Sequence, residues 1–302
     1  MAWSGSLTAS SAVGSAITFT PDTNTEGAYT VAAFTAPKKG VYAFQLKGSG
    51  GTVTVNQKYS PGGVGGFTTG YLLLEKGQTV YVGAGGTCSA AFVSKTNGSA
   101  LKNISAGNLY FVAGAGGGGG AMWDLGSQNV SGSGGEGGGT TGLSGWDAYG
   151  SRGGGSGGTQ SSGYGYGHGG GGGYANHGNY STHGGRGGDG YYGGNGGGYS
   201  WGGGGGSGYI HVETVKVNTK TFTNTTQQGG GAGSNARGSV EVSYYARAEL
   251  PIIFNGTTLE RLFYNGVEVE SLIYDGTKLF MRRLRDATQN CFAPRRHAPC
   301  LV

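Results

Sequence analysis

Short runs of apolar, β-branched and aromatic residues, separated by turn-forming residues, fill the first 113 positions of the chain. Such runs, spaced at roughly a dozen residues, are typical of the strands of a β-sandwich or jelly roll. No apolar stripe with the helical period is long enough to predict a helix. We therefore predict strands at 17–20, 29–34, 41–46, 52–55, 67–74, 79–82, 91–93 and 109–112.

Two further segments with alternating polarity lie beyond position 208. Tyr209–Val217 alternates as one strand with a solvated face, and Ser239–Tyr245 alternates in the same way. A polar link, Asn224–Ala236, separates them. We predict that residues 209–248 supply the closing strands of the first sandwich, so that residues 114–208 are an insertion within it.

The pattern changes again at residues 249–281, where three units of ten residues follow one another. Asn255-Gly256, Asn265-Gly266 and Asp275-Gly276 occupy the same place in each unit. Asn-Gly and Asp-Gly between apolar runs favour two-residue hairpin turns, because both turn residues need positive φ. We predict a small β-meander, which buries too little surface to be stable without a partner or oligomer. Residues 282–302 form a basic tail, expected to be a flexible end or to dock on an acidic surface.

Glycine dominates the predicted insertion. Of the 95 residues from Gly114 to Gly208, 46 are glycine, out of 72 in the whole chain. Such a composition, without the collagen period, is typical of a disordered low-complexity segment. Disorder is therefore the first alternative for this region.

The spacing of the glycines favours an ordered structure. In an extended helix of the polyproline II type, with three residues per turn, a helix enclosed by neighbours requires glycine on every face. A helix at the rim can keep one side chain per turn. Several blocks fit the rim pattern, with one larger residue after two glycines. We therefore predict a bundle of polyglycine II helices whose rim carries Glu136, Ser156, Arg186, Asp189 and Asn195.

The charge, the apolar segments and the cysteines of the chain argue against several classes of protein. The formal net charge is +5, but the tail holds five arginines and one aspartate, so the rest of the chain is nearly neutral. A nucleic-acid partner is therefore not expected. Neither a signal peptide nor an 18-residue apolar segment is recognisable, so we expect no membrane insertion. Of the three cysteines, Cys291 and Cys300 could pair and Cys88 would remain alone.

Several motifs, in order, resemble a known family. They are FTAPKKGVY at 34–42, LKGSGG at 46–51, GGF at 65–67, LLLEKGQTVYVGAGG at 72–86 and LYFVAGAGGGGG at 109–120. Over residues 30 to 245 the chain is similar to the glycine-rich domain of anaplastic lymphoma kinase-type receptors and its bacterial and phage relatives. The resemblance implies a jelly-roll-like β-sandwich from which bundled polyglycine helices emerge.

The departures from this family point to its phage relatives. Cys88 stands where the receptors have disulfide pairs, and no kinase or membrane span is present. The glycine blocks also resemble the polyglycine-helix adhesins of T-even-like phage tail fibres, and the decapeptide units resemble repeats of tail and surface proteins of gut Firmicutes and their phages. These resemblances imply a phage or prophage tail-fibre protein in the virion. It would be made in the host cytoplasm and act extracellularly, alongside other tail proteins.

The loops between glycine blocks carry the predicted binding site. Their aromatic residues offer large contact area at low entropic cost, as in antibody paratopes, and could contact a host cell-surface glycan or protein. The alternative is that these rings cap the bundle against water. The candidates are Trp123, Trp146, Tyr149, Tyr164, Tyr166, His168, Tyr174, His177, Tyr180, His183, Tyr191, Tyr192, Tyr199 and Trp201.

Other chemistry is poorly supported by the sequence. The spacing of His168, His177, His183 and Asp189 matches no closed metal site, so we expect neither a metal nor a cofactor. No nucleophile-base set or carboxylate pair stands out, so an enzyme is not expected. A purely structural spacer or cap, and a glycine-rich RNA-associated protein, remain alternatives. A homotrimer and a single chain are both compatible with the sequence.

Overall fold

The computed structural model describes residues 2–52, 54–56, 58–124, 131–147, 149–176, 180–217 and 220–247, together with six short strands between Ile252 and Lys278. This part of the chain is all-β, and every paired strand in it is antiparallel. Its helical content is two 3₁₀ turns, Leu101–Asn103 and Ala106–Asn108. The chain divides into two compact units, Met1–Ala248 and Glu249–Val302.

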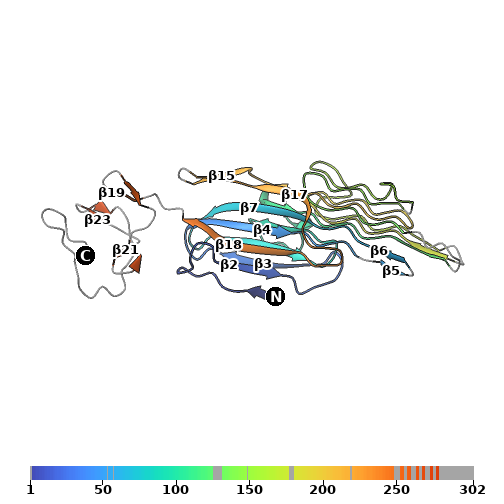
Figure 1. Cartoon of the computed structure of the whole chain (residues 1–302), viewed down its shortest axis with the longest axis horizontal. Coiled ribbons are helices and arrows are strands. Elements are labelled where there is room, and N and C mark those ends of the chain that lie inside the picture. The colour runs from blue at the N-terminus through green and yellow to red at the C-terminus, as the bar shows by residue number, and fades with distance from the viewer. Residues whose placement is uncertain are drawn as a thin grey trace. The chain divides into compact units, whose positions relative to one another are not determined.

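Six strands form the first sheet, in the order β1-β2-β18-β4-β7-β17. Strand β18 pairs with both β2 and β4, so a strand from beyond the glycine region lies in the middle of a sheet begun at the N-terminus (Figure 1). This confirms the predicted return of residues 239–245 to the first strands. The six strands are β1 (Ala2–Ser4), β2 (Ala16–Thr20), β4 (Gly40–Lys47), β7 (Gly66–Leu74), β17 (Thr225–Gly230) and β18 (Ser239–Arg247).

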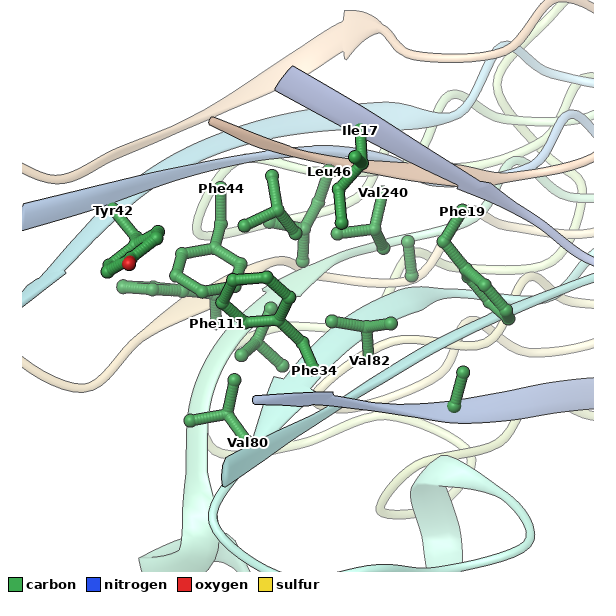
Figure 2. Packing of buried hydrophobic residues seen from close by; sticks show 14 of the residues in the cluster. Ile17, Phe19, Phe34, Tyr42, Phe44, Leu46, Val80, Val82, Phe111 and Val240 are labelled. Carbon is green, nitrogen blue, oxygen red and sulfur yellow. The ribbon is translucent and has the colours of Figure 1, made fainter. Parts of the chain in front are cut away.

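A second sheet holds five strands in the order β14-β10-β9-β8-β3. They are β3 (Tyr29–Thr35), β8 (Thr79–Gly85), β9 (Ala91–Ser94), β10 (Leu109–Ala113) and β14 (Tyr209–Ile210). Alternation along the strands places one set of side chains between the sheets. Phe44 from the first sheet meets Phe34 and Phe111 from the second, with ring centroids 6.2 and 6.3 Å apart (Figure 2). We call these two sheets and their shared core the two-sheet base.

Two predictions for residues 209–236 are wrong. The single strand predicted at 209–217 is broken: β14 pairs with β10, whereas β15 (Thr214–Val217) forms a separate hairpin with β16 (Lys220–Thr223). The break follows from packing, because Val217 and Phe222 of the hairpin lie against Val41 on the outer face of the first sheet. The predicted polar link contains β17, whose residues are polar because it is a largely exposed edge strand.

Most of the region from Gly114 to Gly208 consists of extended segments that hydrogen-bond to one another through the backbone (Figure 1). We call these segments the glycine bundle. Along Gly114–Gly120, successive N–H groups donate to three different neighbouring segments, and every third N–H returns to the same segment. The donor and acceptor residues are Ala115 to Asp189, Gly116 to Ser49, Gly117 to Gly135, Gly118 to Arg186, Gly119 to Thr52 and Gly120 to Gly132.

The segment Gly202–Gly208 lies at the centre of the glycine bundle. It shares backbone hydrogen bonds with six other segments, which are 114–120, 132–139, 142–146, 155–158, 185–188 and 192–195. A Cβ added at Gly203 would overlap the carbonyl group of Arg186, and one at Gly205 that of Glu136. Glycine is thus required here by the close approach of neighbouring backbones. At Gly171, in contrast, an added Cβ would meet no atom within 4 Å.

Short strands also occur in and beside the glycine bundle. A three-stranded sheet, in the order β11-β13-β12, comprises β11 (Ala121–Asp124), β12 (Tyr174–Asn176) and β13 (Tyr180–His183), none of which the sequence predicted. The strand predicted at 52–55 is shorter and shifted. It becomes β5 (Thr54–Asn56), which pairs with β6 (Lys58–Ser60).

The C-terminal unit contains three hairpin pairs, β19 (Ile252–Phe254) with β20 (Thr257–Leu259), β21 (Phe263–Tyr264) with β22 (Val267–Glu268) and β23 (Ile273–Tyr274) with β24 (Thr277–Lys278). Each pair brackets one of the predicted Asn-Gly or Asp-Gly turns, although the turn residues lie outside the described part. Among the described strands the pairs form three separate two-stranded sheets, so the predicted continuous meander is wrong. The described part of the chain does not include Cys291, Cys300 or the basic tail.

Candidate functional site

The glycine bundle has two ends that differ in their surroundings. One end joins the two-sheet base, because Gly114 follows β10 and Gly208 precedes β14. Seven residues of extended chain, such as 202–208, span about 20 Å, so the other end lies well away from the base. Four links between consecutive bundle segments lie at that far end. Backbone hydrogen bonds between the segment ends, such as Gly202 to Trp146 and Gly120 to Gly132, place them there. We call the described residues of these links, which are 121–124, 131, 147, 149–153, 174–176, 180–183 and 199–201, the distal loops.

Exposed aromatic side chains gather in and beside the distal loops. Of the predicted site residues, Trp146, Tyr149, Tyr174, Tyr199 and Trp201 lie there with 37% to 85% of their surface exposed. His183 is exposed, and its ring centroid lies 4.8 Å from that of Tyr174. Trp123 and Tyr180 belong to β11 and β13, which pair with each other in the same region. His177 lies outside the described residues.

The loop after Trp146 is ordered by its own hydrogen bonds. The Asp147 carboxylate accepts hydrogen bonds from the backbone N–H groups of Tyr149 and Ser151, both at 2.8 Å. The guanidinium of Arg152 lies over the Trp146 ring, 5.2 Å from its centroid. Because these contacts fix the backbone, Tyr149 is presented on a preorganised turn although its own ring is 85% exposed.

The remaining aromatic candidates lie at the end beside the base. Tyr191 stacks on Tyr209 of β14, with ring centroids 4.2 Å apart and an interplanar angle of 8°. The hydroxyl of Tyr166 donates to the carbonyl oxygen of Ile104 at 2.6 Å, and Tyr192 lies edge-on to Tyr166. Burial, followed by the neighbouring tyrosines, raises the pKa of Tyr166 to about 12. Tyr166 and Tyr191 therefore join the bundle to the base.

Tyr164 and His168 also belong to the end beside the base. Their rings meet edge-on at 5.5 Å, and His168 Nδ1 lies 3.0 Å from the carbonyl oxygen of Tyr166. Tyr164 nevertheless remains 54% exposed. The sequence grouped these residues with the distal aromatics because both sets follow glycine blocks, and the structure separates the two sets by the length of the bundle.

An ion pair between Arg186 and the buried Asp189 joins the glycine bundle to the base, and the predicted rim position of Asp189 is wrong. Asp189, predicted at the rim, is 1% exposed. Its carboxylate accepts hydrogen bonds from Arg186 Nη2 at 2.7 Å, the Tyr29 hydroxyl at 2.8 Å and the Gly169 N–H at 2.8 Å. Tyr29 starts β3, and its hydroxyl accepts from the Ala90 N–H at 3.1 Å. The network thus links both sides of the junction.

Burial perturbs the titratable groups of this junction. It raises the pKa of Asp189 above its ordinary value, although Arg186 and the donated hydrogen bonds oppose the shift. Burial, and then the Asp189 charge, raises the pKa of Tyr29 well above its ordinary value. Burial also raises the pKa of the Cys88 thiol to about 12. Such a thiol is protonated at neutral pH and is a poor nucleophile.

The geometry gives no support to a metal site built from the candidate histidines. His168 lies beside the base and His183 lies at the distal end. Within the described residues, no group of three or more His, Cys, Asp or Glu side chains could hold a metal ion. In the same part of the chain, no helix has the length and apolar character needed to cross a membrane.

Comparisons with known proteins give no family for this chain. No protein-family model matches the sequence, and no curated protein matches it. The resemblance to phage glycine-rich proteins therefore remains a prediction from the motifs.

Proposed function

We propose that the protein is a phage or prophage tail-fibre or tail-tip protein, and that its distal loops bind the host surface. The observation that carries this proposal is the collection of exposed aromatic side chains at the end of the glycine bundle away from the base. Exposed aromatic groups gathered at one site favour a binding surface, since single scattered ones are ordinary. Tyrosine and tryptophan lose little conformational entropy when they bind.

In this proposal the glycine bundle is a set of polyglycine II helices that emerges from a jelly-roll-like sandwich. The return of every third N–H group to the same neighbour supports this, because a helix with three residues per turn directs its donors in that order. The glycines at the centre, where an added Cβ would overlap backbone, support it as well. The bundle would then hold the binding loops at a fixed distance from the remaining tail proteins.

The experiment compares aromatic residues at the two ends of the bundle. Purified full-length protein is incubated with cells from a panel of bacteria, and bound protein is measured. Replacement of Trp146, Tyr149 and Tyr174 by alanine should weaken binding about a hundredfold or more, because central aromatic contacts carry much of an interface's energy. Tyr164→Ala, which removes an exposed ring beside the base, is the matched control and should bind as the wild type does.

The outcomes separate this function from a structural role. If the triple variant keeps the wild-type circular dichroism spectrum and binds normally, attachment does not use the distal aromatic side chains, and their role is to cap the bundle. If the wild-type protein binds no cells and does not compete with phage adsorption, the attachment function is wrong.

A further inference from the structure

Three of the four edge strands of the two-sheet base are protected against pairing with another chain. Strands β1 and β14 are only three and two residues long. Strand β17 has a bulge between Gln227 and Gly230, and two glycines with positive φ lie at this point. Short edge strands and bulges are common means by which proteins prevent association through sheet edges.

The fourth edge strand, β3, has none of these protections. It pairs with β8 over seven consecutive residues without a bulge. Its sequence, Tyr-Thr-Val-Ala-Ala-Phe-Thr, contains no charged residue, no proline and no glycine. Among the described strands, β8 alone pairs with it, so its other side is a free edge. A regular, uncharged edge of this length favours pairing with a further strand.

The register of β3 with β8 shows which backbone groups lie on the free side. The N–H of Gly86 donates to the carbonyl oxygen of Ala28, and the N–H of Ala36 donates to that of Gln78. The even-numbered residues of this segment therefore bond to β8, and the odd-numbered ones direct their N–H and C=O groups away from it. Within the described residues, these outward groups make no hydrogen bond. They belong to Tyr29, Val31, Ala33 and Thr35.

We propose that β3 pairs with β3 of a second copy of this chain, antiparallel and about a twofold axis at Ala32. Ala32 is the middle residue of the strand, so this register places Tyr29 opposite Thr35 of the other copy, and Val31 opposite Ala33. Each opposed pair exchanges two hydrogen bonds, because outward groups meet outward groups. Every free donor of the edge then has an acceptor, and the edge is complementary to itself.

The charges that flank β3 favour the same arrangement. Glu26 precedes the strand and is exposed, whereas Lys38 and Lys39 follow it. Antiparallel pairing brings the start of each strand to the end of the other, so charges of opposite sign meet at both ends. Because β3 starts beside the glycine bundle, the bundles of the two copies extend in opposite directions. The pairing does not depend on the attachment function.

Sedimentation of the full-length protein at several concentrations tests the pairing. The wild type should show a monomer in equilibrium with a dimer. Ala33→Lys, at an exposed position of the edge, brings like charges together across the twofold axis and should raise the dissociation constant about tenfold or more. Leu73→Lys, at an exposed position of β7 inside the first sheet, is the matched control and should dimerise as the wild type does.

Amide hydrogen exchange then locates the interface. In the dimer, the odd-numbered amides of β3 should exchange more slowly than in the dilute monomer, whereas those of β17 should not change. The pairing would be overturned by a protein that stays monomeric, by a trimer, or by a dimer that neither protects these amides nor responds to Ala33→Lys. Protection already present in the dilute monomer would show that the same chain covers the edge, and would also overturn the pairing. Host-cell binding is measured separately, so either proposal can fail alone.

Discussion

The two-sheet base and the glycine bundle hold the same chain together by opposite means. In the base, alternating strands bury side chains such as Phe44 and Phe111 between two sheets (Figure 2). In the bundle, Ser207 is the single residue of the central segment Gly202–Gly208 with a side chain to bury, and the backbone groups hydrogen-bond in several directions. Glycine loses more conformational entropy on folding than other residues. The bundle is therefore stabilised by close packing and by hydrogen bonds between the peptide groups of neighbouring segments.

This difference predicts opposite sensitivities to substitution. The base should be damaged when atoms are removed, because a cavity loses packing contacts. The bundle should be damaged when a single methyl group is added, because neighbouring backbones occupy that space. The junction should be sensitive to charge, because it buries an ion pair. Each sensitivity can be measured separately.

The largest effect is expected in the base. Phe44→Ala should lower the free energy of unfolding by about 3–5 kcal/mol, since Phe44 is fully buried between the sheets. Urea unfolding followed by tryptophan fluorescence measures the change. Leu73→Ala in the same sheet, where the side chain is exposed, should cost less than about 1 kcal/mol. Equal losses in the two variants would contradict the packing argument.

A somewhat smaller effect is expected from adding one carbon to the glycine bundle. Gly117→Ala should lower the free energy of unfolding by about 3 kcal/mol, because its Cβ would overlap the carbonyl group of Gly203 and lie 2.7 Å from the carbonyl oxygen of Gly204. Thermal unfolding monitored by circular dichroism provides the measurement.

Gly171→Ala is the matched control for this substitution. It adds the same methyl group where no atom lies within 4 Å, so the change should stay within about 0.5 kcal/mol of the wild type. If Gly117→Ala is as stable as Gly171→Ala, the segments do not pack as closely as described.

The smallest effect is expected at the junction, and it should depend on pH. Arg186→Met leaves Asp189 buried without its cation and should cost about 2 kcal/mol at pH 7, less than for a fully buried pair because the Arg186 side chain is 22% exposed. Burial already raises the pKa of Asp189, and loss of Arg186 raises it further. The folded variant then binds a proton more tightly than the unfolded chain, so its stability should recover as the pH falls from this raised pKa towards the ordinary one.

Unfolding temperatures at several pH values test this recovery. Arg152→Met removes an exposed arginine of the distal loops and should show no comparable pH dependence. His168 also interacts with Asp189, so the measurement is repeated in a His168→Gln background. A loss in Arg186→Met that stays constant with pH would show that packing of the arginine, and not its charge, stabilises the junction.

The strands of the base could be predicted because their period of two reports directly on a buried face. Residues 239–245 alternate and pair as expected. Strand β17 escaped detection because Thr-Thr-Gln-Gln-Gly-Gly is an edge strand with little to bury, and its pairing depends on β7 beside it. The break after Ile210 was missed because alternation continues through it while the pairing partner changes.

The candidate site was predictable in its residue types but not in its grouping. Aromatic residues at both ends of the bundle come after glycine-rich segments. The sequence therefore does not show that Tyr149 lies at the distal end and Tyr166 at the end beside the base. The end at which an aromatic residue lies is decided by the direction of its segment in the bundle. That direction depends on hydrogen bonds between residues distant in sequence. The same limit applies to Asp189, whose place after two glycines resembles a rim position. Its burial depends on Tyr29, 160 residues away.

Along Gly114–Gly120, every third N–H group donates to the same neighbouring segment, and this order limits how the bundle can change in length. Insertion or deletion of one or two residues in such a segment would redirect every later donor to the wrong neighbour. A change of three residues restores the order and shifts the segment by about 9 Å. Variants of this architecture should therefore differ by whole triplets in the bundled segments, whereas the distal loops can vary by any number of residues.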